Sequence, residues 1–163
     1  SSDVCSSDLM EALKAFNRFR DDEGAVLKKE FITRIELIEK KLKEIIALDP
    51  RRAENVRERL KKNLEESAAK ESVDMNRFEQ EIIYYLEKFD ISEEKLRLKT
   101  HCEYFLKTMK EESSGRKLGF IAQEIGREIN TIGSKANDAE IQKFVVEMKD
   151  ELEKIKEQLL NVL

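Results

Sequence analysis

Two glutamates in the second half of the chain have the type and spacing to bind a metal ion. Glu124 and Glu128 are four positions apart, so on a helix their carboxylates stand on one face, about 5 to 6 Å apart at Cβ. Like charges at this spacing destabilise a helix unless a cation neutralises them. Carboxylate oxygens are the ligands that Mg²⁺ and Mn²⁺ prefer. Either a divalent metal binds this pair, or nearby basic residues simply balance a solvated face.

His101, the single histidine of the chain, is the candidate general acid or base. Histidine titrates near neutral pH, so it can exchange a proton with a ribose 2′-hydroxyl or a leaving 5′-oxygen, or bind a metal. On a helix it shares a face with Glu94 and Arg97, at steps of three and four. A histidine at the edge of an apolar stripe is also explained as a packed, hydrogen-bonded residue, and both interpretations stay open.

Basic and polar residues around the glutamates are suited to phosphate. Arg127 is the candidate for stabilising negative charge that develops on phosphorus. The candidate RNA-binding and phosphate-binding residues are Arg116, Lys135, Asn130, Thr131, Ser134 and Arg20. Their alternative roles are pairing with the glutamates and capping helix ends. Asp138 and Glu140 join the glutamate pair as candidate metal ligands, although acidic residues are favoured at a helix N-terminus in any case.

The stretch from Gly115 to Glu140 must position most of these residues. Its apolar residues recur at steps of three and four, which predicts an α-helix with a break at Gly133-Ser134. Four of the five glycines lie in this stretch, and a glycine inside a helix costs about 1 kcal/mol relative to alanine. The helix is therefore expected to lie close to another backbone or close to a ligand.

The rest of the chain also has helical periodicity, and no segment alternates as a strand does, so the fold class is all-α. A first helix is expected from Met10 to Leu48, with Gly24 interrupting it and Asp49-Pro50 ending it. A second helix, about 51–70, has a narrow apolar stripe typical of a long antiparallel hairpin arm. A turn at 72–76 precedes a third helix whose broad apolar face, starting at Phe78, predicts a place in the core.

Two further helices complete the expected helical bundle. The fourth runs from about Glu93 to Glu111, with Asp90 or Ser92 as its cap. The last carries an a/d heptad seam that predicts a coiled-coil contact within the fold or between subunits. The residues of this seam are Ile141, Val145, Met148, Leu152, Ile155, Leu159 and Val162.

The composition of the chain excludes several classes of protein. Charged residues make up 40% of its 163 residues, but the net charge is only -4, so the two signs are interleaved and neither favour nor exclude nucleic acid. Two cysteines without paired spacing, and no secretory apolar segment, predict a reduced cytoplasmic protein. No apolar run approaches the roughly 20 residues of a membrane span.

The first nine residues, SSDVCSSDL, nearly repeat themselves and share nothing with the helical pattern that follows. We interpret 1–9 as a non-native, adapter-like segment. The remaining 10–163 are expected to form one helical domain, with a helical arm at about 25–72 and the core and site at 73–163.

A longer motif resembles a known family. The residues Arg127, Glu128, Asn130, Thr131, Ser134, Lys135, Asp138, Ala139 and Glu140 follow the pattern R-E-x-N-T-x-x-S-K-x-x-D-A-E. This pattern resembles the C-terminal end of the YicC/YloC family of bacterial stress-associated proteins, and segments at 20–24, 76–81 and 90–101 also look like family segments. The resemblance covers about 10–163. Family members also carry a β-containing N-terminal domain, which we expect to be missing from this sequence.

The resemblance implies a metal-dependent endoribonuclease that cleaves RNA phosphodiester bonds with Mn or Mg and forms homo-oligomeric rings, with a hexamer as one candidate. The motif, together with the Glu124/Glu128 pair and His101, predicts the catalytic residues His101, Glu124, Glu128 and Arg127. Two alternatives stay open: an RNA-binding adaptor without catalysis, and an oligomerisation module built on the long charged helices. This chain is also expected to be less active than a complete protein.

Overall fold

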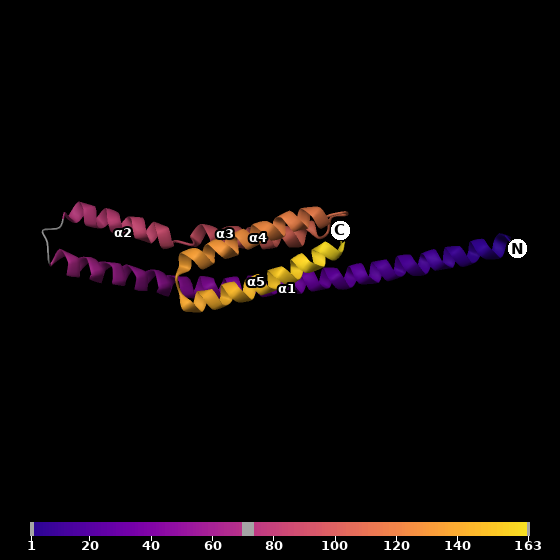
Figure 1. The fold of residues 1–163 in the computed structure, drawn as a ribbon, viewed down its shortest axis with the longest axis horizontal. Helices are drawn as coiled ribbons and strands as arrows, with labels where there is room; N and C mark the ends of the chain where they lie inside the picture. Colours follow the sequence, from indigo (N-terminus) through magenta and orange to yellow (C-terminus); the bar gives the residue numbers. More distant parts are fainter. Residues whose placement is uncertain (1, 70–73, 163) are drawn as a thin grey trace.

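The chain is built of α-helices. The computed structural model describes residues 2–69 and 74–162, and this part contains five helices and no strand. They are α1 (Ser2–Ala68), α2 (Met75–Phe89), α3 (Ser92–Thr108), α4 (Gly115–Ala136) and α5 (Ala139–Val162) (Figure 1). The all-α prediction is confirmed. Within the described residues, no helix combines the length and the apolar run that a membrane crossing requires.

The core lies where the middle of α1 packs beside α3, α4 and α5. Helix α5 lies against both α1 and α4, and α3 lies against α4 and α1. The heptad seam of α5 faces into this core, and its residues from Ile141 to Leu159 are buried. The contribution of α1 comes from Phe31, Ile35, Ile38, Leu42 and Ile45, all of which are buried. This bundle fixes the positions of α3 and α4, which carry the site.

Helix α1 runs without interruption through Pro50, so the expected end at Asp49-Pro50 is wrong. In Figure 1 the axis of α1 changes direction beside the junction of α4 and α5, as expected at a proline. Asp49 is 7% exposed and binds Arg52 at 2.8 Å and Lys95 at 2.5 Å. Arg52 also donates to the backbone oxygens of Ala136 at 3.2 Å and Phe89 at 2.6 Å. These contacts hold the helical backbone on both sides of the proline.

The third predicted helix, α2, does not belong in the core. None of its residues is buried, and it runs back along the part of α1 that follows Pro50 (Figure 1). Its apolar residues from Phe78 to Phe89 are at most half-buried because only one helix covers them along most of their length. The arm therefore consists of α2 and the end of α1. We expected 31–45 in the arm, but the apolar side chains of this range lie in the core. Of the expected turn, 72–73 lie outside the described residues.

The first part of α1 extends beyond the bundle as a single helix (Figure 1). It begins at Ser2, not at Met10, and Gly24 does not interrupt it. Leu9, Leu13 and Phe16 are each more than half exposed. The helix includes 2–9, and this says nothing about the origin of these residues, so the interpretation of the segment as non-native stays a prediction.

Candidate active site

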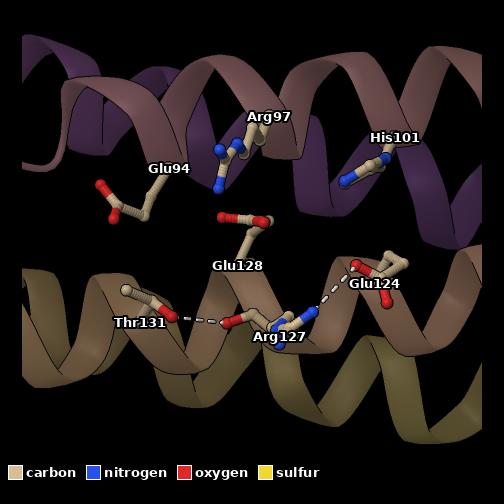
Figure 2. A pocket seen from close by; sticks show the side chains of 7 residues that line it. All are labelled: Glu94, Arg97, His101, Glu124, Arg127, Glu128 and Thr131. Carbon is tan, nitrogen blue, oxygen red and sulfur yellow. Dashed lines mark hydrogen bonds and ion pairs between the residues drawn. The ribbon is translucent and has the colours of Figure 1, made fainter.

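A pocket of about 360 Å³ lies between α3 and α4. Helix α3 supplies one wall and α4 supplies the other (Figure 2). The residues that line it are Glu94, Arg97, His101, Glu124, Arg127, Glu128 and Thr131. The structure thus brings together His101, Glu124, Arg127 and Glu128, which are the residues that we predicted as catalytic.

Helix α4 positions its wall of the pocket through the faces that it presents to its neighbours. Its apolar residues, such as Ile125 and Ile129, are fully buried in the core, and Glu124 and Glu128 project from an adjacent face toward α3 (Figure 2). The helix continues through Gly133 and ends at Ala136, where Asn137 adopts a left-handed φ of 42°. The expected break at Gly133-Ser134 is therefore wrong.

The glycines of α4 allow close packing against α5. A Cβ at Gly126 would lie 3.1 Å from Leu152 Cδ2, and a Cβ at Gly133 would lie 3.1 Å from Val145 Cγ1. Both separations are tighter than ordinary van der Waals contact. Gly126 and Gly133 are therefore explained by close packing against side chains of α5, whereas a Cβ at Gly119 would have no atom within 4 Å, so close packing does not explain that glycine.

Glu128 is a buried carboxylate inside the pocket. It is 4% exposed, and in Figure 2 it points from α4 toward Arg97 on the opposite wall, whereas His101 lies across from Glu124. No hydrogen bond or ion pair between described residues includes its side chain. Its carboxylate lines the pocket, so it is available to a cation or a proton donor that enters there.

Glu124 has a different environment from Glu128. It pairs with Arg127 at 3.8 Å, and both side chains of this pair are largely exposed. A long, exposed ion pair contributes little to stability. Both partners are therefore free to bind a ligand at the mouth of the pocket.

Glu94 is a second buried carboxylate of the site, and we did not predict it as a site residue from the sequence. It is 5% exposed. Its Oε1 accepts a hydrogen bond from Lys135 at 2.6 Å, and its buried Oε2 has no hydrogen-bond partner. Lys135 also lies 3.4 Å from the backbone oxygen of Asp90. The predicted phosphate-binding lysine is thus held on α3.

Arg97 also lines the pocket, and sequence reasoning left it out of the site. It pairs with Glu93 one turn earlier in α3, and its side chain is 55% exposed. The signal that identifies both missed residues is their helical spacing from His101, since Glu94, Arg97 and His101 follow one another at steps of three and four. This spacing predicts a shared face but not that the face points toward α4.

The predicted hydroxyl ligands are occupied by their own helix. Thr131 Oγ1 donates to the backbone oxygen of Arg127 at 3.0 Å, and Ser134 Oγ donates to that of Thr131 at 3.0 Å. Asn130 and Arg116 are exposed and lie outside the pocket lining. Of these polar residues, only Thr131 reaches the pocket.

Three predicted site residues lie elsewhere. Asp138 caps α5, because its Oδ1 accepts the backbone N–H groups of Glu140 at 3.0 Å and Ile141 at 2.9 Å. Glu140 is exposed in the first turn of α5. Arg20 borders a separate hollow of about 700 Å³ near the end of α5. Asp138 and Glu140 are thus explained by the preference for acidic residues at a helix N-terminus. Arg20 lies on the projecting part of α1 and not in the pocket.

Two groups near the pocket have shifted pKa values. Burial raises the pKa of the Cys102 thiol to about 12, with smaller contributions from nearby glutamates. This cysteine, next to His101 in sequence, therefore stays protonated near neutral pH and is a poor nucleophile. Hydrogen bonds from the side chain and backbone of Ser92 lower the pKa of Asp90, and this interaction holds the start of α3.

The donor chemistry of the pocket suits a hard divalent cation. Glu128 lacks a counter-ion, and Glu94 has a buried oxygen without a partner. In the described part of the chain, no group of three or more His, Cys, Asp or Glu residues is arranged to hold a metal ion. A cation would therefore be bound through one or two carboxylates together with water or substrate oxygens, which is the usual mode for Mg²⁺.

The fold and the pocket define a class: an all-α domain with carboxylates, a histidine and arginines facing one cavity. Residues 45–163 match a family model described as "Endoribonuclease YicC-like, C-terminal". The chain belongs to this family.

Two curated relatives extend the match across nearly the whole chain. A "Probable endoribonuclease YicC" of Clostridioides difficile (strain 630) is 39% identical over 154 residues, which are 93% of this chain and 53% of the relative. A protein of the same description from Haemophilus influenzae (strain ATCC 51907 / DSM 11121 / KW20 / Rd) is 33% identical over 165 residues, covering 98% of this chain and 57% of the relative. The chain spans about half the length of these relatives.

Proposed function

We propose that this chain contributes the catalytic pocket of an endoribonuclease and that RNA phosphodiester bonds are cleaved between α3 and α4 with the help of Mn or Mg. One observation carries the proposal: His101, Arg127, Glu124 and Glu128 line a single pocket. Support for RNA as the substrate comes from the family and from the two relatives described as endoribonucleases.

Each wall of the pocket has its own role in this proposal. On α3, His101 transfers a proton to or from a ribose or leaving-group oxygen. On α4, Arg127 stabilises negative charge on the phosphate, for which its exposed guanidinium is well placed. Arg97 contributes a second guanidinium from α3.

The metal of this proposal is assigned to the carboxylates of the pocket. Glu128, with Glu124 or Glu94, would hold it, because two of these carboxylates are buried and Glu128 lacks a counter-ion. A bound divalent metal supplies charge stabilisation at a phosphoryl oxygen and acidifies its bound water. Glu140 is not proposed as a metal ligand, because it lies in the first turn of α5 and outside the pocket lining.

We also propose that the protein works in the cytoplasm as a homo-oligomer. Support for association comes from the projecting part of α1, where Leu13, Phe16 and Phe19 are exposed on a helix without a neighbour in Figure 1. Sedimentation of the chain tests this: a strict monomer at micromolar concentration would argue against it.

Cleavage of a structured RNA in Mn, Mg or EDTA tests the catalytic proposal. The chain and the full-length Clostridioides difficile relative are assayed together, and the same positions are changed in both. We expect His101→Ala and Glu128→Gln to lose at least about 100-fold in rate, the low end for general acid–base catalysis. Glu140→Gln is the matched control and should keep its activity. A 2′,3′-cyclic phosphate end indicates attack by the 2′-hydroxyl, and a 5′-phosphate end indicates attack by water.

Unchanged cleavage in both pocket variants would refute the site, and full activity in EDTA would refute the metal. If RNA is bound but never cleaved by either protein, the function is that of an RNA-binding adaptor.

A further inference from the structure

The outward face of α4 carries a continuous stripe of exposed residues without a single acid. We call it the outer stripe, and it consists of Arg116, Phe120, Gln123, Arg127, Asn130 and Ser134. At about 100° per residue, these positions fall within about 80° of one another around the helix axis. The core residues of α4 lie on the opposite side.

The composition of the outer stripe is unusual for this chain. The chain has 35 acidic residues and a net charge of -4, and most of its exposed helix surface mixes both signs. Two arginines, two amides, a serine and a phenylalanine replace that mixture here. An acid-free face in an acidic protein is complementary to a polyanion.

Phe120 is the residue that a simple solvated surface does not explain. It is 59% exposed, and no ring or cation contact between described residues includes it. Leu118 and Ile121, its neighbours in α4, are buried and supply the core contacts of this turn. An exposed aromatic ring between cationic side chains offers a flat surface on which a nucleobase can stack.

The outer stripe is continuous with the pocket. Arg127 belongs to both, and Thr131 and Glu124 border the stripe on the side that faces α3. From Arg116 to Ser134 the stripe is about 27 Å long at 1.5 Å per residue. A strand lying along it therefore passes the mouth of the pocket.

We propose that the outer stripe binds a single-stranded segment of the RNA substrate and leads it past the pocket, an inference that rests on the proposed function. Arg116 and Arg127 bind phosphates, a base stacks on Phe120, and Gln123 and Asn130 hydrogen-bond to base edges. Phe120 and Gln123 are thus substrate-binding residues outside the pocket. A duplex fits less well because its bases are already stacked on each other.

Binding to a fluorescein-labelled 12-nucleotide oligouridine in EDTA, followed by anisotropy, tests this role without turnover. Phe120→Ala should weaken binding by about 5- to 140-fold, the range for one base–aromatic stack. Phe120→Tyr should bind as the parent does because it keeps the ring. Arg116→Ala should also reduce the slope of log affinity against log salt by about 0.7, as expected for one phosphate contact with a single strand.

Two exposed residues of α2 provide matched controls. Ile83 is 55% exposed and the Arg77 side chain is 82% exposed, and both lie outside the outer stripe. Ile83→Ala and Arg77→Ala should bind oligouridine as the parent does. Every substitution is at an exposed position, so circular dichroism should report an intact helical fold.

Three results would overturn the proposal. In the first, Phe120→Ala binds RNA as tightly as Ile83→Ala does. In the second, a duplex binds as tightly as the single strand. In the third, Phe120→Ala changes sedimentation but not RNA affinity, which would make the outer stripe a protein interface. The two proposals fail separately. If RNA binding depends on Phe120 but no form of the protein cleaves RNA, the proposed nuclease activity is refuted and the role of the outer stripe is not. If RNA is cleaved and Phe120→Ala leaves cleavage unchanged, only the role of the outer stripe is refuted.

Discussion

Arg52 provides the most direct test of how the arm is joined to the bundle. Its guanidinium is 6% exposed, binds Asp49 at 2.8 Å and donates to the carbonyls that end α4 and α2. Replacing it with alanine leaves both helix ends without this cation and Asp49 with Lys95 alone. Removal of one partner of a buried ion pair costs about 3–5 kcal/mol. For a chain of this size, we expect Arg52→Ala to lower the melting temperature by about 6 to 20 °C.

The neighbouring Arg51 is exposed and serves as the control. Thermal and urea unfolding of Arg51→Ala should stay within about 0.5 kcal/mol of the parent, as for ordinary surface changes. Arg52→Lys keeps the charge but cannot reach three acceptors at once, so it should fall between the two. Equal stability of Arg51→Ala and Arg52→Ala would refute the idea that this contact holds α2 and α4 to α1.

Three further predictions concern α4, α5 and the start of α3. Gly119→Ala should raise the unfolding free energy by about 0.5–1 kcal/mol because no atom lies within 4 Å of the new Cβ. Gly126→Ala should be less stable than Gly119→Ala, since its Cβ would lie 3.1 Å from a leucine of α5. Asp138→Ala should cost about 0.5–2 kcal/mol as a lost helix cap without changing Mn affinity in calorimetry. Asp90 has a lowered pKa in the folded state, so its stabilisation is present above its unfolded pKa of about 3.9 and is lost as pH falls through the folded value. Ser92→Ala should reduce this loss in unfolding titrations between pH 7 and 2, and an unchanged pH profile would contradict the assignment.

The spacing of residues along each helix was enough to predict which side chains share a face. It did not show that the two faces lie opposite each other and enclose a pocket. Glu124 and Glu128 share a face of any helix that contains them, and the structure keeps them on one face of α4. That His101 lies opposite them came from the family resemblance, since no spacing relates α3 to α4. We did not predict Glu94 as a site residue because the spacing along α3 does not show which of its faces points toward α4. Only the packing of α3 against α4 places this buried carboxylate at the pocket.

Proline and amphipathic patterns misled the fold prediction for physical reasons. A proline inside a helix costs about 3 kcal/mol, which usually ends the helix, but α1 continues here, where Asp49 and Arg52 bind each other and the neighbouring helices. The broad apolar face of α2 is equally suited to a bundle and to a two-helix arm. Periodicity defines the face of a helix that is covered but does not identify the helix that covers it.

Helix α4 shows why its glycines and its chemistry occur together. One side enters the core through residues such as Ile125, and Gly126 and Gly133 let α5 approach an adjacent side. Because α5 packs closely on the glycine side, the side chains toward α3 and toward solvent remain available for a ligand. A larger residue at Gly133 would have to move Val145 or shift α4 toward α3 and narrow the pocket. The glycines are therefore structural residues through which the packing of α5 sets the width of the candidate active site.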